Sequence, residues 1–323
     1  MIRRREFITL LGGAAVWPRA AWAQPSERLR RVGLLMIGGG LADSLLQPAF
    51  REGMAKLGWV EGRNLRIDVR TSAGPRLAAD AEELANLHPD VIFAYTGAAL
   101  RAAQRATQTI PIVFVGAGDP AQYNLTGGIA RPTGNATGFA NNISSLGSKW
   151  LELLKQAAPR TTRVARVYDP EISERDLADI IGAADARLAV ATFDMPVRDT
   201  DEIERAISTF AAEPTGGLLL TGPLPTIKTD AILRLAVRYR LPTMRGSVKL
   251  VAEGLLMSYG SDSLDMVRDA ASYVDRILRG AKPSDLPVQY PTKFPLVINL
   301  KTARAIGLEI SPSLLAIADE VIE

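Results

Sequence analysis

Apolar, β-branched runs alternate with amphipathic stretches along almost the whole chain. The runs VIFAY (91–95) and IPIVFVGA (110–117) are nearly continuous apolar segments, which are typical of strands buried on both faces of a parallel sheet. Strands that alternate with helices form right-handed βαβ units. The sequence therefore predicts an α/β fold built on parallel sheets.

This alternation occurs in two series of similar size, which predicts two Rossmann-like lobes with parallel sheets. The polar, Gly-rich segment 131–147 lies between the series, and we expect it to be the first crossing between the lobes. Near the C-terminus, we expect a strand-like run at 295–308 and a terminal helix at 311–322, capped by Ser311. The expected strands are 31–38, 65–72, 91–97, 110–117, 163–169, 188–195, 216–222, 242–246 and 255–260, and the expected helices are 47–57, 77–87, 98–108, 145–158, 174–187, 200–212, 226–240 and 263–279.

Residues 1–23 have the three parts of an export signal. Arg3, Arg4 and Arg5 precede a mildly apolar middle at 8–17, and Ala21-Trp22-Ala23 fits the small-x-small rule for cleavage. The arginine pair followed by x-Phe-Ile is typical of the twin-arginine route. The apolar middle is too short for a membrane span, which needs about 20 residues. We expect cleavage after Ala23 and a mature chain that is free in the periplasm.

The charge balance argues against nucleic acid as a partner, which favours an excess of basic residues. The net charge is +3, and the four Arg and one Glu of the leader account for all of it. The chain has no Cys and a single His, His88. Thiol chemistry and disulfides are therefore excluded, and no second His is present to complete a metal site. We predict neither a metal nor a cofactor.

Polar or Gly-rich turns follow several of the predicted strands. Ligands of open α/β sheets bind at the carboxyl ends of strands, and glycine lets a ligand approach the backbone. Each turn could equally be an ordinary tight βα connection, so the prediction depends on several of them meeting in one cleft. The candidate ligand-binding residues are Gly39, Ser44, Thr96, Gly97, Asp119, Tyr168, Asp169, Thr221 and Arg245.

No motif predicts catalysis. The chain lacks a Gly-x-Ser-x-Gly elbow and a phosphate-binding loop, and His88 has no nucleophile partner that the sequence identifies. Gly116-x-Gly118-x-x-Ala121 matches half of a dinucleotide fingerprint, but it follows the fourth strand instead of the first. The sequence does not exclude a pair of carboxylates that would hydrolyse a glycoside. We predict binding without reaction.

Four runs resemble segments of a known family. They are GGIARPTGNATGF (127–139), LMSYG (256–260), YVDRILRGAKPSDLPVQYPTKF (273–294) and the C-terminal block 291–323. They are similar to the tryptophan/tyrosine-type substrate-binding proteins of ABC transporters, over essentially the whole chain. The resemblance implies a type I periplasmic-binding-protein fold, with two lobes, three crossovers and a ligand between them. It also implies a small-molecule solute and an ABC permease of the inner membrane as partners, and we expect a monomer.

Family topology implies where the lobes and hinges lie. Lobe one would hold 24–141 with 256–288, and lobe two would hold 142–255 with 289–323. Hinges absorb dihedral change at the ends of elements. The implied hinge candidates are Asn141–Asn142, Ser258–Tyr259 and Pro287–Tyr290, and Tyr259 joins the candidate ligand-binding residues.

The resemblance also implies roles for residues in lobe one. Asp119 would pair with a ligand ammonium or cap the next helix. Thr96 and the amides near Gly97 would bind a carboxylate, as helix N-termini do.

The chain departs from the family pattern at several strand ends. Residues 121–124 are Ala-Gln-Tyr-Asn where small residues are usual, Asp169-Pro170 stands where Asn-Pro is expected, and Arg245-Gly246 stands where Tyr-Gly is frequent. Arginine is suited to bidentate capture of a carboxylate, so Arg245 is a candidate anchor for an acid. The alternatives are that it pairs with Asp169 or lies in solvent.

These observations predict a periplasmic solute-binding protein that delivers an amino acid, or an aromatic or branched acid, to an ABC importer by lobe closure. Two alternatives stay open. One is a sensory binding subunit for a membrane receptor, and the other is an exported enzyme.

Overall fold

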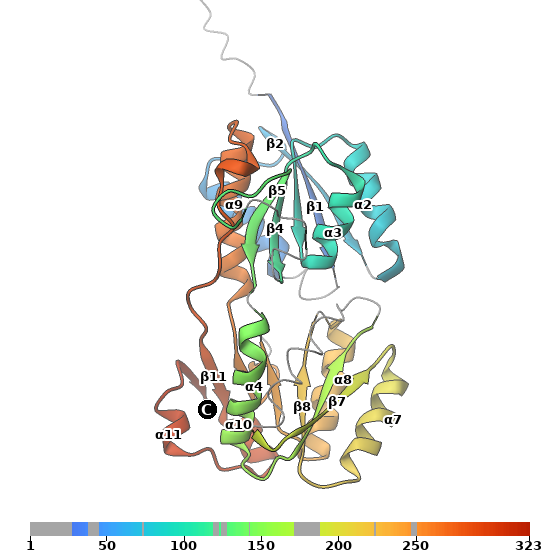
Figure 1. Ribbon diagram of the computed structural model, residues 1–323, viewed down its shortest axis with the longest axis vertical. Coiled ribbons are helices and arrows are strands. Elements are labelled where there is room, and N and C mark those ends of the chain that lie inside the picture. The colour runs from blue at the N-terminus through green and yellow to red at the C-terminus, as the bar shows by residue number, and fades with distance from the viewer. Residues whose placement is uncertain are drawn as a thin grey trace, which may run out of the picture.

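The computed structural model describes residues 28–37, 45–72, 74–118, 123, 128–141, 143–170, 188–222, 224–246 and 251–323. These residues form two α/β units, one above the other in Figure 1. The first sheet has five strands in the order β2-β1-β3-β4-β5, and the second has seven in the order β12-β11-β10-β9-β8-β6-β7. Every ladder between the described strands is parallel except the one between β10 and β11.

We call the first sheet and its helices lobe one. Its central strands are buried on both faces: α1 and α9 cover one face, and α2 and α3 cover the other. Figure 1 shows α9 along the side of this lobe although it comes late in the chain. The elements are β1 (Arg30–Ile37), α1 (Gln47–Lys56), β2 (Leu65–Ser72), η2 (Gly74–Arg76), α2 (Leu77–Asn86), β3 (Val91–Tyr95), α3 (Gly97–Ala106), β4 (Ile112–Ala117), β5 (Ala136–Ala140) and α9 (Ser263–Leu278).

We call the second sheet and its helices lobe two. Its core lies in two layers, because α4 and α10 cover one face of the sheet while α7 and α8 cover the other. The elements are α4 (Ile143–Ala157), β6 (Arg163–Tyr168), β7 (Ala191–Pro196), α7 (Thr200–Ala211), β8 (Gly216–Leu220), α8 (Thr226–Arg238), β9 (Thr243–Arg245), β10 (Met257–Tyr259), β11 (Leu296–Asn299), α10 (Leu300–Ala305), α11 (Pro312–Leu315) and β12 (Glu320–Ile322). The 3₁₀ turn η5 (Pro283–Asp285) follows α9.

Three expectations about elements differ from the structure. The expected strand-like run at 295–308 is a strand only over β11, and the helix α10 follows directly. The expected crossing at 131–147 contains β5, a fully buried strand that pairs with β4. The expected terminal helix is a single turn, α11, and the chain then forms β12, which pairs with β11 because the edge of the sheet offers free backbone groups there. Ser311 does cap α11, since its Oγ accepts from the amide of Leu314. The expected helix 174–187 lies outside the described residues.

The boundary expected at residue 256 also differs. β10 hydrogen-bonds with β9 and β11, so the chain leaves the second sheet only after Tyr259. The other lobe boundaries stay a prediction.

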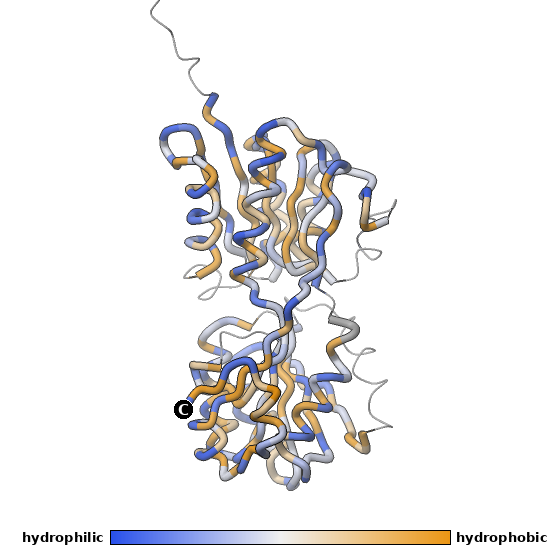
Figure 2. The backbone as a smooth tube through the Cα atoms, turned by 90° about the vertical axis from the view of Figure 1, so that its left-hand side faces the viewer, coloured by the Kyte–Doolittle hydropathy of each residue, from blue (hydrophilic) through white to orange (hydrophobic). Residues whose placement is uncertain are grey.

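Between the elements that the structure describes, the chain passes from one lobe to the other three times, and the crossings contact one another. The Oγ of Ser261 lies 3.4 Å from the Oδ1 of Asn141, which joins the second crossing to the first. The amide of Ala140 donates to the carbonyl of Gln289 at 2.8 Å, which joins the third crossing to β5. Figure 2 shows these segments at the narrow waist between the lobes, with apolar strands inside each lobe and polar residues on the helices outside.

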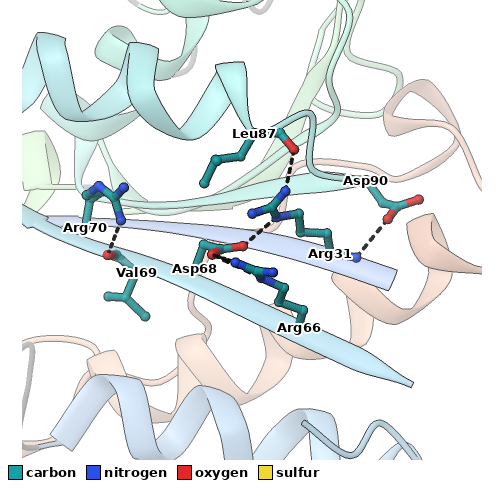
Figure 3. Close-up of polar contacts among 7 residues, drawn as sticks. All are labelled: Arg31, Arg66, Asp68, Val69, Arg70, Leu87 and Asp90. Atoms are coloured by element: carbon teal, nitrogen blue, oxygen red, sulfur yellow. Dashed lines mark hydrogen bonds and ion pairs between the residues drawn. The ribbon is translucent and has the colours of Figure 1, made fainter. Parts of the chain in front are cut away.

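A charged cluster lies on the edge strand β2 of the first sheet and on its neighbour β1 (Figure 3). The Nε of Arg31 donates to the Oδ2 of Asp68 at 2.6 Å, and the Nη2 of Arg66 donates to the Oδ1 of Asp68 at 3.2 Å. The amide of Arg31 donates to Asp90 at 2.8 Å. Charged side chains at an edge strand discourage pairing with another sheet, so this cluster has a structural role at the edge.

Candidate functional site

The strand ends of the two lobes face each other. β5 and β10 both end where the chain crosses to the other lobe. Apart from β11 and β12, the other strands of each sheet run parallel to the one of these two in the same sheet. Arg245 at the end of β9 is paired in register with Leu220 of β8 and with Ser258 of β10. The amide of Thr221 donates to the carbonyl of Val167 on β6. Four neighbouring strands of lobe two therefore end side by side, toward lobe one.

Three of these strand ends carry a buried polar atom that has no hydrogen-bond partner in the described part of the chain. The atoms are Thr221 Oγ1, Arg245 Nη1 and Ser258 Oγ. Thr221 is 3% exposed and Ser258 is fully buried. Buried polar groups are normally satisfied, and one left without a partner costs about 1–3 kcal/mol. Each atom has almost no accessible surface in this conformation, so a ligand could supply the missing partner only after a local rearrangement.

Arg245 is a partly desolvated cation at this edge. Its Nη2 donates to the carbonyl of Gly222 at 3.0 Å. Burial lowers the pKa of Arg245 to about 10, while Tyr95 and Glu253 act in the opposite direction. The guanidinium is therefore still charged at neutral pH. Asp169 pairs with Lys228 and not with Arg245. The alternative that Arg245 pairs with Asp169 is therefore wrong.

Tyr95 of lobe one approaches the same guanidinium from across the lobes. It ends β3 and packs against the core of lobe one that includes α9. Burial raises the pKa of Tyr95, against the opposing effects of Ser263 and of the charge of Arg245.

Asp169 follows β6 and is only 3% exposed. Its Oδ2 accepts from the Nζ of Lys228, in the first turn of α8, at 2.5 Å. The lysine side chain is 13% exposed, so the pair is buried. Removing one partner of a buried ion pair is strongly destabilising. The bond to Lys228 therefore fixes this carboxylate at the strand ends of lobe two.

Other residues that were predicted to bind the ligand form contacts within the protein that explain their presence without a ligand. Thr96 caps α3, since its Oγ1 accepts from the amide of Ala99, and Gly97 is the buried first residue of that helix. Thr96 has φ of +91°, a strained conformation for a non-glycine residue that is characteristic of functional sites. Tyr168 ends β6 beneath the guanidinium of Arg166, whose Cζ lies 4.3 Å from the ring centroid.

Tyr259 lies on β10 and faces the core of lobe two. Its ring centroid is 6.2 Å from that of Phe294, and its carbonyl accepts from the Nε1 of Trp150 at 2.6 Å. A ligand contact for Tyr259 stays a prediction. Gly39, Ser44 and Asp119, the hinge residue Asn142 and the whole leader lie outside the described residues.

Sequence reasoning missed two polar residues near these strand ends, Tyr95 and Lys228, and it named Ser258 only as a hinge candidate. Tyr95 reads as an ordinary strand residue, and Lys228 reads as an exposed position on a helix. A signal for Tyr95 was available, because it directly precedes Thr96 at the carboxyl end of a buried strand.

The part of the chain that the structure describes has no group of three or more His, Cys, Asp or Glu that could hold a metal ion. Among the same residues, no helix combines the length and apolar character that a membrane crossing requires.

The family model for ABC transporter substrate binding proteins matches residues 41–322. The chain belongs to this family. A curated relative, the tyrosine-binding protein of Clostridioides difficile (strain R20291), is 21% identical over 287 residues, which span 88% of this chain and 83% of the relative. The family is one of binding proteins, not of enzymes.

Two solved structures are similar over nearly the whole chain. One is an ABC domain from Streptococcus pneumoniae in complex with L-Trp, with a TM-score of 0.79 and 22% identity over 91% of this chain and 99% of that one. The other is a conserved domain protein from Vibrio cholerae, with a TM-score of 0.79 and 23% identity over 91% of this chain and 100% of that one. The predicted fold is confirmed: two α/β lobes of the type I periplasmic-binding-protein kind.

Proposed function

We propose that this protein is a monomeric periplasmic solute-binding protein that carries a small carboxylate-bearing solute to an ABC permease of the inner membrane. The observation that supports it most is Arg245, a half-buried cation whose Nη1 atom is buried without a hydrogen-bond partner at the facing strand ends. A carboxylate offers the acceptors that this guanidinium, Thr221 and Ser258 lack. Relatives that are named for tyrosine or were solved with L-Trp support an amino acid or an aromatic acid.

Transport requires two states of the molecule. In the proposed cycle, the solute binds one lobe first, and the second lobe then closes over it. A solute shifts this equilibrium only by its differential affinity for the closed state. Residues that contribute from both lobes, such as Tyr95 and Arg245, would supply that difference, and the permease would recognise the closed form.

The first test identifies a solute and then removes its anchor. Native mass spectrometry of the purified mature protein, followed by a thermal-shift screen of amino acids and carboxylic acids, selects a binder. We expect Arg245→Ala to weaken its binding more than tenfold by isothermal titration calorimetry. Arg234→Ala, on the exposed face of α8 in the same lobe, is the matched control and should leave the dissociation constant unchanged. An unchanged constant in Arg245→Ala would remove Arg245 from the site.

The charge of Arg245 also sets a pH limit on binding. Because its pKa is about 10, the guanidinium should stay protonated between pH 6 and 9 and lose its charge only above about pH 10. We expect little change in solute affinity from this residue across the lower range and a fall above it. A loss of affinity near pH 7 would point to a different ionisable group.

A further inference from the structure

A cavity of about 370 Å³ lies beside the third crossing between the lobes. The described residues that line it come from three parts of the chain: Phe139 of β5, the α9 residues Met266, Asp269 and Ser272, and residues 289–292. None of them is among the candidate ligand-binding residues. The volume is within the range of pockets that bind small molecules, so the cavity is large enough for a second ligand.

The third crossing is fastened to lobe one as far as Gln289. The amide of Gln289 donates to the carbonyl of Gly138 on β5 at 2.9 Å. The hydroxyl of Tyr273 on α9 donates to the carbonyl of Pro287 at 2.8 Å and accepts from the Nε2 of Gln289 at 3.1 Å. This part of the crossing therefore moves with lobe one.

Lobe two holds the chain again from Leu296, the first residue of β11, whose amide donates to Asp319 at 2.7 Å. Residues 290–295, between these two points, belong to no helix or strand. Hinges absorb dihedral change at the ends of elements, so closure of the lobes must bend this segment. Pro291 and Thr292 of the segment line the cavity. An occupant would therefore contact residues that move when the lobes close.

The lining of the cavity combines one carboxylate with apolar surface. Asp269 is the charged residue among the described ones that line it, and the neighbouring Arg268 pairs at 2.9 Å with Asp265 instead. Burial, and after it the negative charge of Asp265, raises the pKa of Asp269. An ammonium ion beside this carboxylate would favour its charged form, while the largely buried Phe139 and Met266 would contact hydrocarbon.

We propose that this cavity binds a small organic cation, with its ammonium at Asp269 and its apolar part against Phe139 and Met266, and that its occupancy changes the affinity for the solute. The coupling rests on the proposed function, because it acts through lobe closure, whereas the binding site itself does not. By linkage, the cation and the solute change each other's affinity by the same factor.

Two probes that differ in charge test the site on the wild-type mature protein. They are the 2-phenylethylammonium ion and 2-phenylethanol, which share one skeleton. Calorimetry at pH 7.5 should show that the ammonium binds about three- to fivefold more tightly, as expected for a partly exposed ion pair. Equal binding of the two probes, or binding of neither, would overturn the inference.

Two variants locate the probe. Asp269→Asn should remove the preference for the ammonium, while Asp230→Asn on the exposed face of α8 is the matched control and should keep it. Ser272→Trp, which adds a bulky side chain to the lining, should weaken the binding of both probes. Melting curves establish that the variants fold, and either variant alone decides the location if the other does not. An unchanged preference in Asp269→Asn, or unchanged binding in Ser272→Trp, would contradict the assignment to this cavity.

The solute that the thermal-shift screen selects then tests the coupling. Native mass spectrometry should show a ternary complex of protein, solute and 2-phenylethylammonium, and a saturating concentration of the ammonium should change the dissociation constant of the solute by about fivefold or more. Asp269→Asn should reduce this change. Displacement of the ammonium by the solute would place it in the candidate site and overturn the inference, and a ternary complex with an unchanged constant would overturn the coupling. A screen that finds no solute would overturn the proposed function, while the two probes would still decide whether the cavity binds a cation.

Discussion

Gly246 and Gly260 allow β9 and β10 to end against each other and against α4. A Cβ on Gly246 would lie 2.5 Å from the Cζ2 of Trp150, and a Cβ on Gly260 would lie 1.9 Å from the carbonyl oxygen of Gly246. Trp150 cannot easily move aside, because it is 4% exposed and its indole donates to the carbonyl of Tyr259. At both positions, the absence of a side chain is a steric requirement of the base of the candidate site.

Alanine at either glycine should therefore destabilise the protein. We expect Gly246→Ala to lower the free energy of unfolding by about 1–3 kcal/mol, as overpacked cores do, and Gly260→Ala to lower it further, because backbone cannot rotate away as a side chain can. Urea unfolding followed by circular dichroism measures both. Gly33→Ala on β1 is the control, since its added Cβ meets only ordinary contacts at 3.4 Å or more. Equal stability of all three variants would contradict the steric argument.

At this scale, the sequence predicts part of the candidate site. Arg245 and Thr221 could be chosen because they end apolar strands, where side chains meet a ligand. Lys228 could not be chosen, because a lysine in a first helical turn is common on surfaces and only the tertiary fold brings it to Asp169. Nor could Ser258, whose unpartnered hydroxyl is visible only when all of its neighbours are known.

Among the elements, β2 combines a sheet edge with a charge cluster. The guanidinium of Arg31, and to a smaller extent that of Arg66, hold the pKa of Asp68 below its ordinary value of 3.8. A carboxyl whose folded pKa is depressed stabilises the fold above its unfolded pKa, and this contribution is lost as the pH falls through the folded value. The edge of lobe one should therefore be one source of acid sensitivity.

Asp68→Asn should reveal this contribution. At pH 7, we expect the variant to be less stable by about 1 kcal/mol, which is less than a fully buried charged hydrogen bond contributes because solvent screens this partly exposed site. The difference should shrink below pH 4 as wild-type Asp68 becomes protonated. Thermal melts from pH 2.5 to 7 provide the measurement, with Asp230→Asn on the exposed face of α8 as the control. A difference that does not depend on pH would mean that packing, and not charge, causes the loss.

Elements differ in how far the sequence specifies them. The buried strands β1, β3, β4, β6 and β8 could be predicted to within a few residues, because short runs rich in apolar residues between turn residues are typical of strands in the middle of a parallel sheet. β5 and β12 could not, because ATGFA and EVI are short and contain polar residues, and each is a strand through its pairing with a neighbour. The strand propensity of a segment gives no information about the neighbouring strand with which it pairs.

For the whole molecule, the positions of the tryptophans allow the lobes to be observed separately. Once the expected leader is removed, Trp59 and Trp150 are the remaining tryptophans of the sequence. Trp59 donates to Asp275 of α9 at 2.8 Å and lies within lobe one. Trp150 belongs to lobe two and bonds to Tyr259, directly before the second crossing. Only Trp150 is therefore attached to a segment that must change its dihedral angles if the lobes close.

Lobe closure should thus change the fluorescence of Trp150 and not that of Trp59. In Trp59→Phe, we expect a saturable change in emission on addition of a bound solute, with the same midpoint as calorimetry, because the hinge beside Tyr259 moves. In Trp150→Phe, the remaining signal should stay constant while calorimetry still reports binding. Small-angle scattering of the wild-type protein gives an independent measure, since closure of two lobes must reduce the radius of gyration. Calorimetric binding with neither a fluorescence change in Trp59→Phe nor a smaller radius would show that solute binds without closure, and a permease could then not distinguish the loaded protein by its shape.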